Sequence, residues 1–336
     1  MTNAFSDMTG RLAAALFGAI MNIPERPMRW AQNRLRDGRL GWLFVAPNLA
    51  VFAIFTFLPI LIDFYYAGTG GTALLPSERP WIGGENFASL LDCQNYLDPN
   101  SCARDQFWHG VWNTLGFVTL QVSLMLLFSL LTALVLNREI IGRSFFRAVF
   151  FYPVLLSPVV VALIWKWILQ RDGLLNAGML GLGADPVNWL LDARWAFGWT
   201  VFVSIWAHMG FYTLILLAGL QAIPADIYEA AAMDAAPAGR VFRRITLPLL
   251  MPSLVVVLVL GLIRAVQIFD EVYVLTGGGP GTATTYLVQF IYNTGFASQV
   301  RQYGLAAAAS LLLAGVLLIL TLVQLRGMRA KGDARG

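Results

Sequence analysis

The sequence holds few side chains with the chemistry for catalysis or metal binding, and its two cysteines stand out among them. Cys93 and Cys102 share one polar segment, with eight residues between them. In an oxidising compartment such a pair forms a disulfide that closes a small loop, whereas two reduced thiols are the alternative. A zinc site needs four ligands, and His109 is the only further soft ligand nearby. We therefore predict a candidate disulfide and no metal site.

The two histidines lie in no pattern that predicts catalysis. His109 is interpreted as a loop residue, and His208 as an intrahelical hydrogen bonder within an apolar stretch. The glycine-rich run at 277–281 lacks the lysine of a phosphate-binding loop and predicts a sharp turn instead. The sequence thus predicts a protein that is not an enzyme and binds no cofactor of its own.

The amino-acid composition indicates that membrane-spanning helices are the elements that position these residues. Hydrophobic residues make up 58% of the 336 residues and charged residues only 12%, against about 25% charged residues in soluble domains. Six stretches have the roughly 20 apolar residues that a helix needs to cross the bilayer. Strands are excluded because an open strand leaves backbone groups unsatisfied in lipid. The predicted spans are 41–62, 113–136, 148–169, 196–220, 249–269 and 304–325.

The basic residues predict how these spans are oriented. With six spans both termini lie on one side, and the segments on that side carry 16 Lys and Arg, against five on the other. Cytoplasmic loops are the ones enriched in these residues, so both termini are predicted to be cytoplasmic. The chain then divides into a basic leader 1–39, a membrane domain 40–325 and a tail 326–336. The leader is either an amphipathic helix on the membrane surface or a disordered basic arm.

The cytoplasmic loop between spans four and five, residues 221–248, carries the most specific motif. Ala230 and Ala231 are small enough for a short helix to approach another protein closely. Glu229, predicted near the start of that helix, opposes its positive dipole end. Pro248 then marks the entry to span five. We interpret this loop as a docking element.

The loop resembles the signature of permease subunits of binding-protein-dependent ABC importers, in the sugar and glycerol-phosphate group related to the larger permease subunit of maltose transporters. That signature reads E-A-A, three residues, G, nine residues, I-x-L-P. Ala235 stands where the family usually has glycine, so the turn there is expected to be stiffer or displaced. The residues assigned to the ATPase-coupling loop are Glu229, Ala230, Ala231, Asp234, Ala235, Gly239, Ile245, Leu247 and Pro248.

Two further stretches, 147–169 and 268–292, look like the same group, so the resemblance extends over about residues 40–325. It implies the fold of type I ABC importer permeases in the bacterial inner membrane. It also implies a second homologous permease subunit, two copies of an ATPase that binds ATP and Mg, and a periplasmic solute-binding protein. The implied solute is a carbohydrate or related polyol, and no nucleic acid partner is predicted.

Polar and aromatic residues on spans three to five are the candidates for lining the solute path. Arg264 has two interpretations: it extends to the membrane surface or pairs with Asp270 or Glu271, or it faces the path and contacts a hydroxyl-rich or anionic solute. Lys166, between two tryptophans, is expected to extend toward the interface. The candidate path residues are Tyr152, Ser157, Trp206, His208, Tyr212, Arg264 and Gln267.

Three other functions are weighed against this one. A self-contained secondary transporter needs inverted repeats and intramembrane carboxylates, which we do not find in the sequence. A membrane enzyme or assembly factor is disfavoured because no active-site constellation occurs. An ABC importer subunit for a solute other than a carbohydrate remains open.

Overall fold

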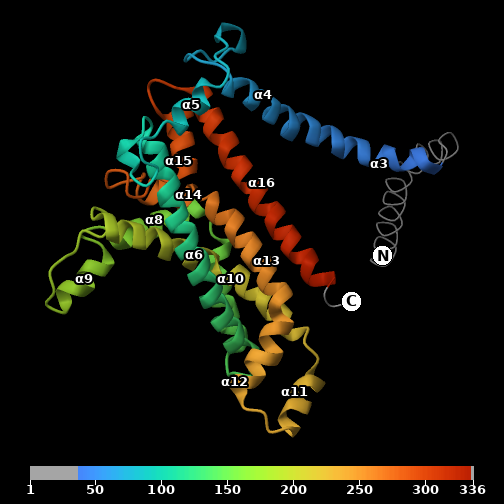
Figure 1. The fold of residues 1–336 in the computed structure, drawn as a ribbon. Coiled ribbons are helices and arrows are strands. Elements are labelled where there is room, and N and C mark those ends of the chain that lie inside the picture. The colour runs from blue at the N-terminus through green and yellow to red at the C-terminus, as the bar shows by residue number, and fades with distance from the viewer. Residues whose placement is uncertain (1–36, 334–336) are drawn as a thin grey trace, which may run out of the picture. The chain divides into compact units, whose positions relative to one another are not determined.

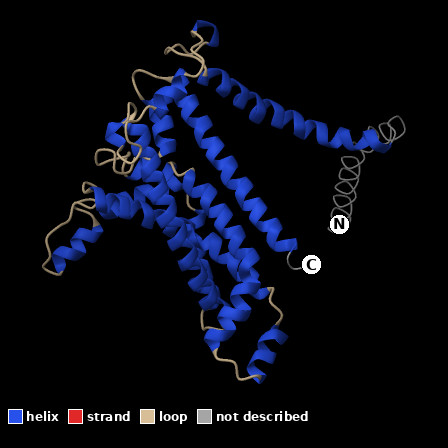
Figure 2. Ribbon diagram, in the orientation of Figure 1, coloured by secondary structure: helices blue, strands red, loops and turns tan. Residues whose placement is uncertain are grey.

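The computed structural model describes residues 37–333, and this part of the chain is predominantly helical (Figure 2). Within that range there is no β-strand, only isolated bridges that join Thr69 to Trp81 and Cys93 to Cys102. The all-α prediction is confirmed for the described residues. The predicted leader lies outside them, apart from its last residues 37–39.

The chain divides into two compact units between Asp63 and Phe64, and each is described by itself. The first contains α3 Asp37–Phe52, the π-helical turn η1 Ala53–Phe57 and the beginning of α4 Leu58–Ala67. A candidate span covers residues 45–67, in agreement with the first predicted span.

Four long helices of the second unit run side by side (Figure 1). Helix α6 contacts α10 and α13, and α13 also contacts α16. Each holds a stretch long and apolar enough to cross a membrane, so predicted spans two, four, five and six are confirmed. The bounds are α6 Asp105–Asn137, α10 Ala193–Gln221, α13 Leu247–Val266 and α16 Tyr303–Asp333.

The third predicted span is present as two helical parts that together are long and apolar enough to cross a membrane, not as one continuous helix. Its first part is α7 Arg143–Phe151 with the 3-10 turn η4 Tyr152–Leu155, and its second part begins with α8 Pro158–Leu169. The two parts meet at 102°. Ser157 is extended, with ψ 138°, as the residue before a proline prefers. Because Pro158 also lacks an N–H, it starts a new helix rather than continuing the old one.

The core between α6, α10 and α13 is built from apolar side chains and close backbone contacts. Phe117, Leu216 and Leu250 are fully buried at its centre. Two glycines of α10 allow close approach: a Cβ added at Gly219 meets Ser253 of α13, and one at Gly210 meets the backbone of α7. Small residues at helix contacts are typical of membrane bundles.

Short helices connect the long ones and lie near both ends of the bundle (Figure 1). The predicted turn at 277–281 is confirmed, because Gly277, Gly278 and Gly281 all have positive φ. This turn is fixed to α6 by Asn113, whose Nδ2 donates to the carbonyl of Thr282 at 2.7 Å. The short elements are η2 Pro76–Glu78, α5 Glu85–Leu91, η3 Pro99–Ser101, α9 Leu174–Gly181, α11 Ala225–Met233, α12 Ala238–Val241, η5 Phe242–Thr246, α14 Asp270–Leu275, α15 Leu287–Tyr292 and η6 Asn293–Ala297.

Candidate functional site

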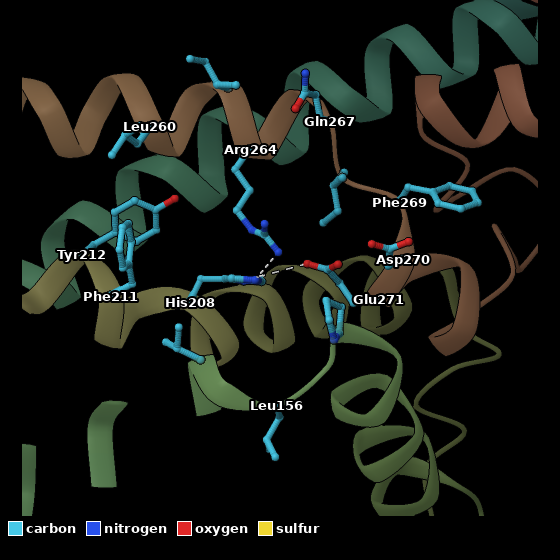
Figure 3. A pocket seen from close by; sticks show the side chains of 14 residues that line it. Leu156, His208, Phe211, Tyr212, Leu260, Arg264, Gln267, Phe269, Asp270 and Glu271 are labelled. Carbon is cyan, nitrogen blue, oxygen red and sulfur yellow. Dashed lines mark hydrogen bonds and ion pairs between the residues drawn. The ribbon is translucent and has the colours of Figure 1, made fainter. Parts of the chain in front are cut away.

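A pocket of about 610 Å³ lies where α10, α13 and α14 meet the break between η4 and α8 (Figure 3). Aromatic and aliphatic side chains form much of its wall, and a few polar groups point into it. Such a combination is typical of sites for small polar ligands. Four of the candidate path residues line this pocket: His208, Tyr212, Arg264 and Gln267.

His208 and Arg264 form the polar centre of the pocket (Figure 3). Nδ1 of His208 lies 2.8 Å from the carbonyl oxygen of Ser204, one helical turn earlier, and donates its hydrogen there. The predicted intrahelical hydrogen bond is therefore present. Nε2 of the same ring contacts Nη2 of Arg264. Since a guanidinium only donates, Nε2 is the acceptor and the imidazole is neutral.

Two carboxylates of α14 complete the polar side of the pocket. Oε1 of Glu271, a residue that is 5% exposed, lies 4.0 Å from Nδ1 of His208. Because that ring is neutral, the contact is not an ion pair. Over the described part of the chain Arg264 forms no ion pair with Asp270 or Glu271. Its guanidinium instead lies in the pocket, with a neutral histidine as its side-chain partner.

The other three candidate path residues are not among those that line this pocket. Trp206 packs in an aromatic cluster, with its ring centroid 5.5 Å from that of Trp165. Tyr152 is 61% exposed at the start of η4, and Ser157 precedes α8 at the break. The sequence analysis chose all seven residues because they are polar or aromatic and lie on spans three to five. Neither property determines the direction in which a side chain points.

Sequence reasoning missed several residues that line the pocket. Phe211 and Phe269 contribute aromatic rings, and Asp270 and Glu271 contribute carboxylates. Asp270 and Glu271 had been considered only as partners for Arg264. Their position depends on the packing of α14 against α8 and α10, between segments far apart in the chain. No local pattern in the sequence signals that packing.

Lys166 has a hydrogen-bond partner that the sequence did not indicate. Its Nζ donates to the carbonyl oxygen of Val274 at 3.0 Å, so the side chain links α8 to α14. That it extends toward the membrane interface stays a prediction. A backbone carbonyl near the end of α14 offers an acceptor close by, and the ammonium group takes it.

The coupling loop folds into a hairpin of α11 and α12 at one end of α10 and α13 (Figure 1). Helix α11 begins at Ala225, and Asp226 is the acidic residue of its first turn. Glu229 therefore lies in the middle of α11, and its predicted place near the helix start was wrong. The earlier start follows from Pro224, which precedes α11 in an extended conformation. The helix-dipole argument made for Glu229 applies to Asp226 instead.

The alanines of α11 face different ways. Ala231 is 7% exposed and is thus buried within the chain, whereas Ala230 and Ala232 are exposed. Ala231 and Ala230 also line a hollow of about 570 Å³ between α11 and the segment formed by the end of α12 and η5. Ala230 and Ala232 are therefore the more accessible of these alanines on this chain.

Ala235 ends α11 in a left-handed conformation, with φ 49°, and is the one non-glycine residue with positive φ among those described. The N–H of Ala236 donates to the carbonyl of Ala231, and the N–H of Ala235 to that of Ala232. These two bonds form a Schellman motif, in which glycine is the preferred residue at the left-handed position. The turn is thus made with alanine, at a cost in backbone strain.

The second half of the hairpin leads directly into span five. Gly239 lies in α12, Ile245 in η5, and Leu247 and Pro248 open α13. Proline is tolerated at the first turn of a helix because its missing N–H has no partner there. The hydroxyl of Tyr228 lies 3.1 Å from Oγ1 of Thr246 and ties α11 to this entry.

At the other end of the bundle, Cys93 and Cys102 are joined by a disulfide. The loop that they close lies between α5 and α6. In the part of the chain that the structure describes, no group of three or more His, Cys, Asp or Glu side chains is arranged to hold a metal ion.

Comparison with known proteins shows that this chain is similar to transport proteins. The family described as "Binding-protein-dependent transport system inner membrane component" matches residues 125–327. A trehalose/maltose transport system permease protein, MalF of Thermococcus litoralis, is 36% identical over 89% of this chain and 97% of its own length. A chain of a bacterial ABC transporter that imports the acidic polysaccharide alginate has a TM-score of 0.73 and 26% identity, with 87% and 95% of the two chains covered.

A second structure shows a bacterial alginate ABC transporter in complex with an alginate pentasaccharide-bound periplasmic protein. Its matching chain has a TM-score of 0.70 and 25% identity, over 85% of this chain and 92% of that one. The family match contains both the pocket and the α11–α12 hairpin.

Proposed function

Because this chain belongs to the family of binding-protein-dependent transport system inner membrane components, we propose how it moves its solute. It is a multi-pass transport subunit of an ABC importer, and the solute is a carbohydrate or a related polyol. The permease path includes the pocket at His208, Tyr212, Arg264 and Gln267. It operates with a second homologous permease subunit and receives its solute from a periplasmic binding protein in the bacterial inner membrane.

The driving force comes from two copies of a separate ATPase, which bind ATP and Mg, and one of the two docks on the α11–α12 hairpin of this chain. The observation that supports this coupling is the continuity between hairpin and pocket. Helix α10 ends at Gln221, just before the hairpin, and carries His208 and Tyr212. The hairpin continues through η5 into α13, which carries Arg264. A displacement of the hairpin therefore reaches both walls of the pocket along rigid helices.

The polar groups of the pocket suit a solute with many hydroxyls. Arg264 and Gln267 are donors, and the carboxylates of Asp270 and Glu271 are acceptors, so a polyhydroxyl molecule finds both. Phe211, Tyr212 and Phe269 offer apolar ring surface between them. The neutral His208 holds Arg264 in place without cancelling its charge.

Reconstitution tests this function. Vesicles that contain the two permease subunits and the ATPase are loaded with ATP and supplied with the solute-binding protein and radiolabelled trehalose or maltose as first probes. We expect uptake that requires both ATP hydrolysis and the binding protein. Uptake driven by an ion gradient without the ATPase indicates a secondary transporter and contradicts the proposal. Binding of a non-carbohydrate by the solute-binding protein contradicts the solute class alone.

A further inference from the structure

The loop closed by Cys93 and Cys102 lies against the first turns of α6 and is held there by several contacts. Nε1 of Trp112 donates to the carbonyl oxygen of Tyr96 at 2.9 Å. Nε2 of His109 lies 3.2 Å from Oδ1 of Asn100. The ring of Tyr96 also packs on that of Trp108, with 5.0 Å between centroids. Because these contacts and the disulfide at its base hold it, the loop has a fixed position along the axis of α6.

That position coincides with the membrane surface. The second span is predicted to begin at about residue 113, directly after Trp112. His109 lies four residues earlier, about 6 Å further out at 1.5 Å per residue. The headgroup layer on each side of the hydrocarbon is itself about 5 to 8 Å thick. The loop from Tyr96 to Asn100 therefore lies at the depth of the lipid headgroups.

The same loop exposes apolar side chains at that depth. Leu97 is 77% exposed and Tyr96 is 49% exposed. Further along α6, the side chains of Trp112, Leu115 and Leu127 are exposed as well. These exposed side chains continue into the apolar span, so the loop extends a surface whose natural solvent is lipid.

Polar groups of the loop also form hydrogen bonds with one another, as a poorly hydrated site requires. The N–H of Leu97 donates to Oδ1 of Asn95 at 3.0 Å. The hydroxyl of Ser101 donates to the carbonyls of Asn95 and Asp98, at 2.9 and 2.8 Å. Groups paired within the loop need no water, which lowers the cost of placing it among headgroups.

We propose that the disulfide-closed loop 93–102 is a membrane-interface anchor, with Tyr96 and Leu97 inserted into the outer-leaflet headgroup layer beside Trp112. Its occupant is lipid rather than the solute-binding protein or the second permease subunit. The proposal rests on the predicted second span and is independent of the solute and of ATPase docking. The anchor fixes the depth of α6 in the bilayer.

A depth measurement tests the anchor in the intact importer. A nitroxide is attached through a genetically encoded ketone side chain at position 97, so that the native cysteines are untouched. The importer is placed in vesicles of phosphatidylethanolamine and phosphatidylglycerol without solute-binding protein. Collision rates are measured with oxygen, which concentrates in lipid, and with a nickel chelate, which stays in water. Labels at Leu115 and Arg301, which is exposed outside the spans, calibrate the lipid and water limits.

We expect oxygen to be favoured over the nickel chelate at position 97 by several-fold, close to the value at position 115. Preference for the nickel chelate, as at position 301, places the loop in water and overturns the proposal. Protection from both reagents places a protein surface over the loop and overturns it as well. After reduction of the disulfide, the oxygen preference should fall at position 97 and persist at position 115. If the oxygen preference at position 97 is unchanged after reduction, the disulfide is not needed for the anchor.

Discussion

At the scale of single residues, the neutral state of His208 decides the character of the pocket. Its Nδ1 is committed to Ser204, so only Nε2 is free to meet Arg264. The guanidinium thus keeps its full charge in the pocket, where Arg264 lies in the last turn of the apolar helix α13. A charge within a membrane span is costly and is usually associated with function.

Replacing Arg264 with glutamine should reduce transport without dissociating the complex. Hydrogen bonds from a charged donor contribute about 1.5 to 3 kcal/mol, so uptake should fall roughly tenfold or more. The measurement is initial uptake rate at limiting solute, with the amount of co-purified ATPase as a check on assembly. Arg301→Gln, at an exposed position outside the spans, serves as the control. Wild-type uptake by R264Q would contradict a role for Arg264 in the path.

Ala235→Gly should stabilise the end of α11. Glycine adopts the left-handed conformation without the penalty of about 1 kcal/mol that alanine carries. That difference corresponds to about fivefold slower amide exchange at Ala236, whose N–H closes the Schellman motif. Hydrogen exchange followed by mass spectrometry measures it. Ala232→Gly is the matched control, because glycine inside the helix should accelerate exchange. Equal effects of the two changes would contradict the strain argument.

At the scale of elements, the α11–α12 hairpin and the broken third span show what structure the loop motif and the prolines of the sequence adopt. The hairpin begins earlier than its motif suggested and buries one of the motif's alanines. The third span bends by 102° at Ser157 and Pro158, and that break contributes Leu156 and Pro158 to the pocket wall. A proline that only interrupts a helix in the sequence thus becomes part of a binding surface.

Ala232→Trp should weaken docking of the ATPase, because Ala232 is exposed on α11 and leaves room for close approach. Glu229→Lys reverses an exposed charge on the same helix and should act in the same direction. Both variants should insert into the membrane normally, while ATPase co-purification and solute-stimulated ATP hydrolysis fall together. Ala232→Ser keeps the small side chain and should behave as wild type.

Ala231→Trp should behave differently from Ala232→Trp. Ala231 is buried and lines the hollow of the hairpin, so a tryptophan there occupies that hollow and changes the packing of the hairpin itself. Faster hydrogen exchange of α11 is expected for A231W but not for A232W. If A232W and E229K kept full transport and normal ATPase binding, the coupling role of the hairpin would have to be abandoned.

At the scale of the whole molecule, the charge distribution predicts the orientation of the bundle. The segments assigned to the cytoplasm hold 16 Lys and Arg against five outside. Reporter fusions should therefore show residue 90 outside the cytoplasm and residue 235 inside it. Paired reporters, one active in each compartment, provide the control. A cytoplasmic signal at residue 90 would reverse the orientation.

The same orientation places Cys93 and Cys102 in the oxidising periplasm, where their disulfide should form. Without reductant, a maleimide added to intact native membranes should label neither cysteine, and after reduction it should label both. Cys93→Ser provides the control, since it frees Cys102 for labelling. Labelling of both cysteines in untreated wild-type membranes would show that they are reduced.

The sequence by itself determined the class of the protein and the place of its apolar spans, and it predicted the position of the coupling loop. These follow from properties carried along the chain: runs of apolar residues long enough for the bilayer, the balance of basic residues, and the spacing from Glu229 to Pro248. Four of the pocket residues were also identified, because polar groups such as His208 and Arg264 are rare within apolar helices.

Only the tertiary structure decided which side chains meet. It placed Glu271 beside His208, gave Lys166 the carbonyl of Val274 and buried Ala231 within the hairpin. Each of these outcomes depends on the face that one helix presents to another. That choice is made by packing between distant segments, and in an almost uniformly apolar helix hydrophobic periodicity does not reveal it.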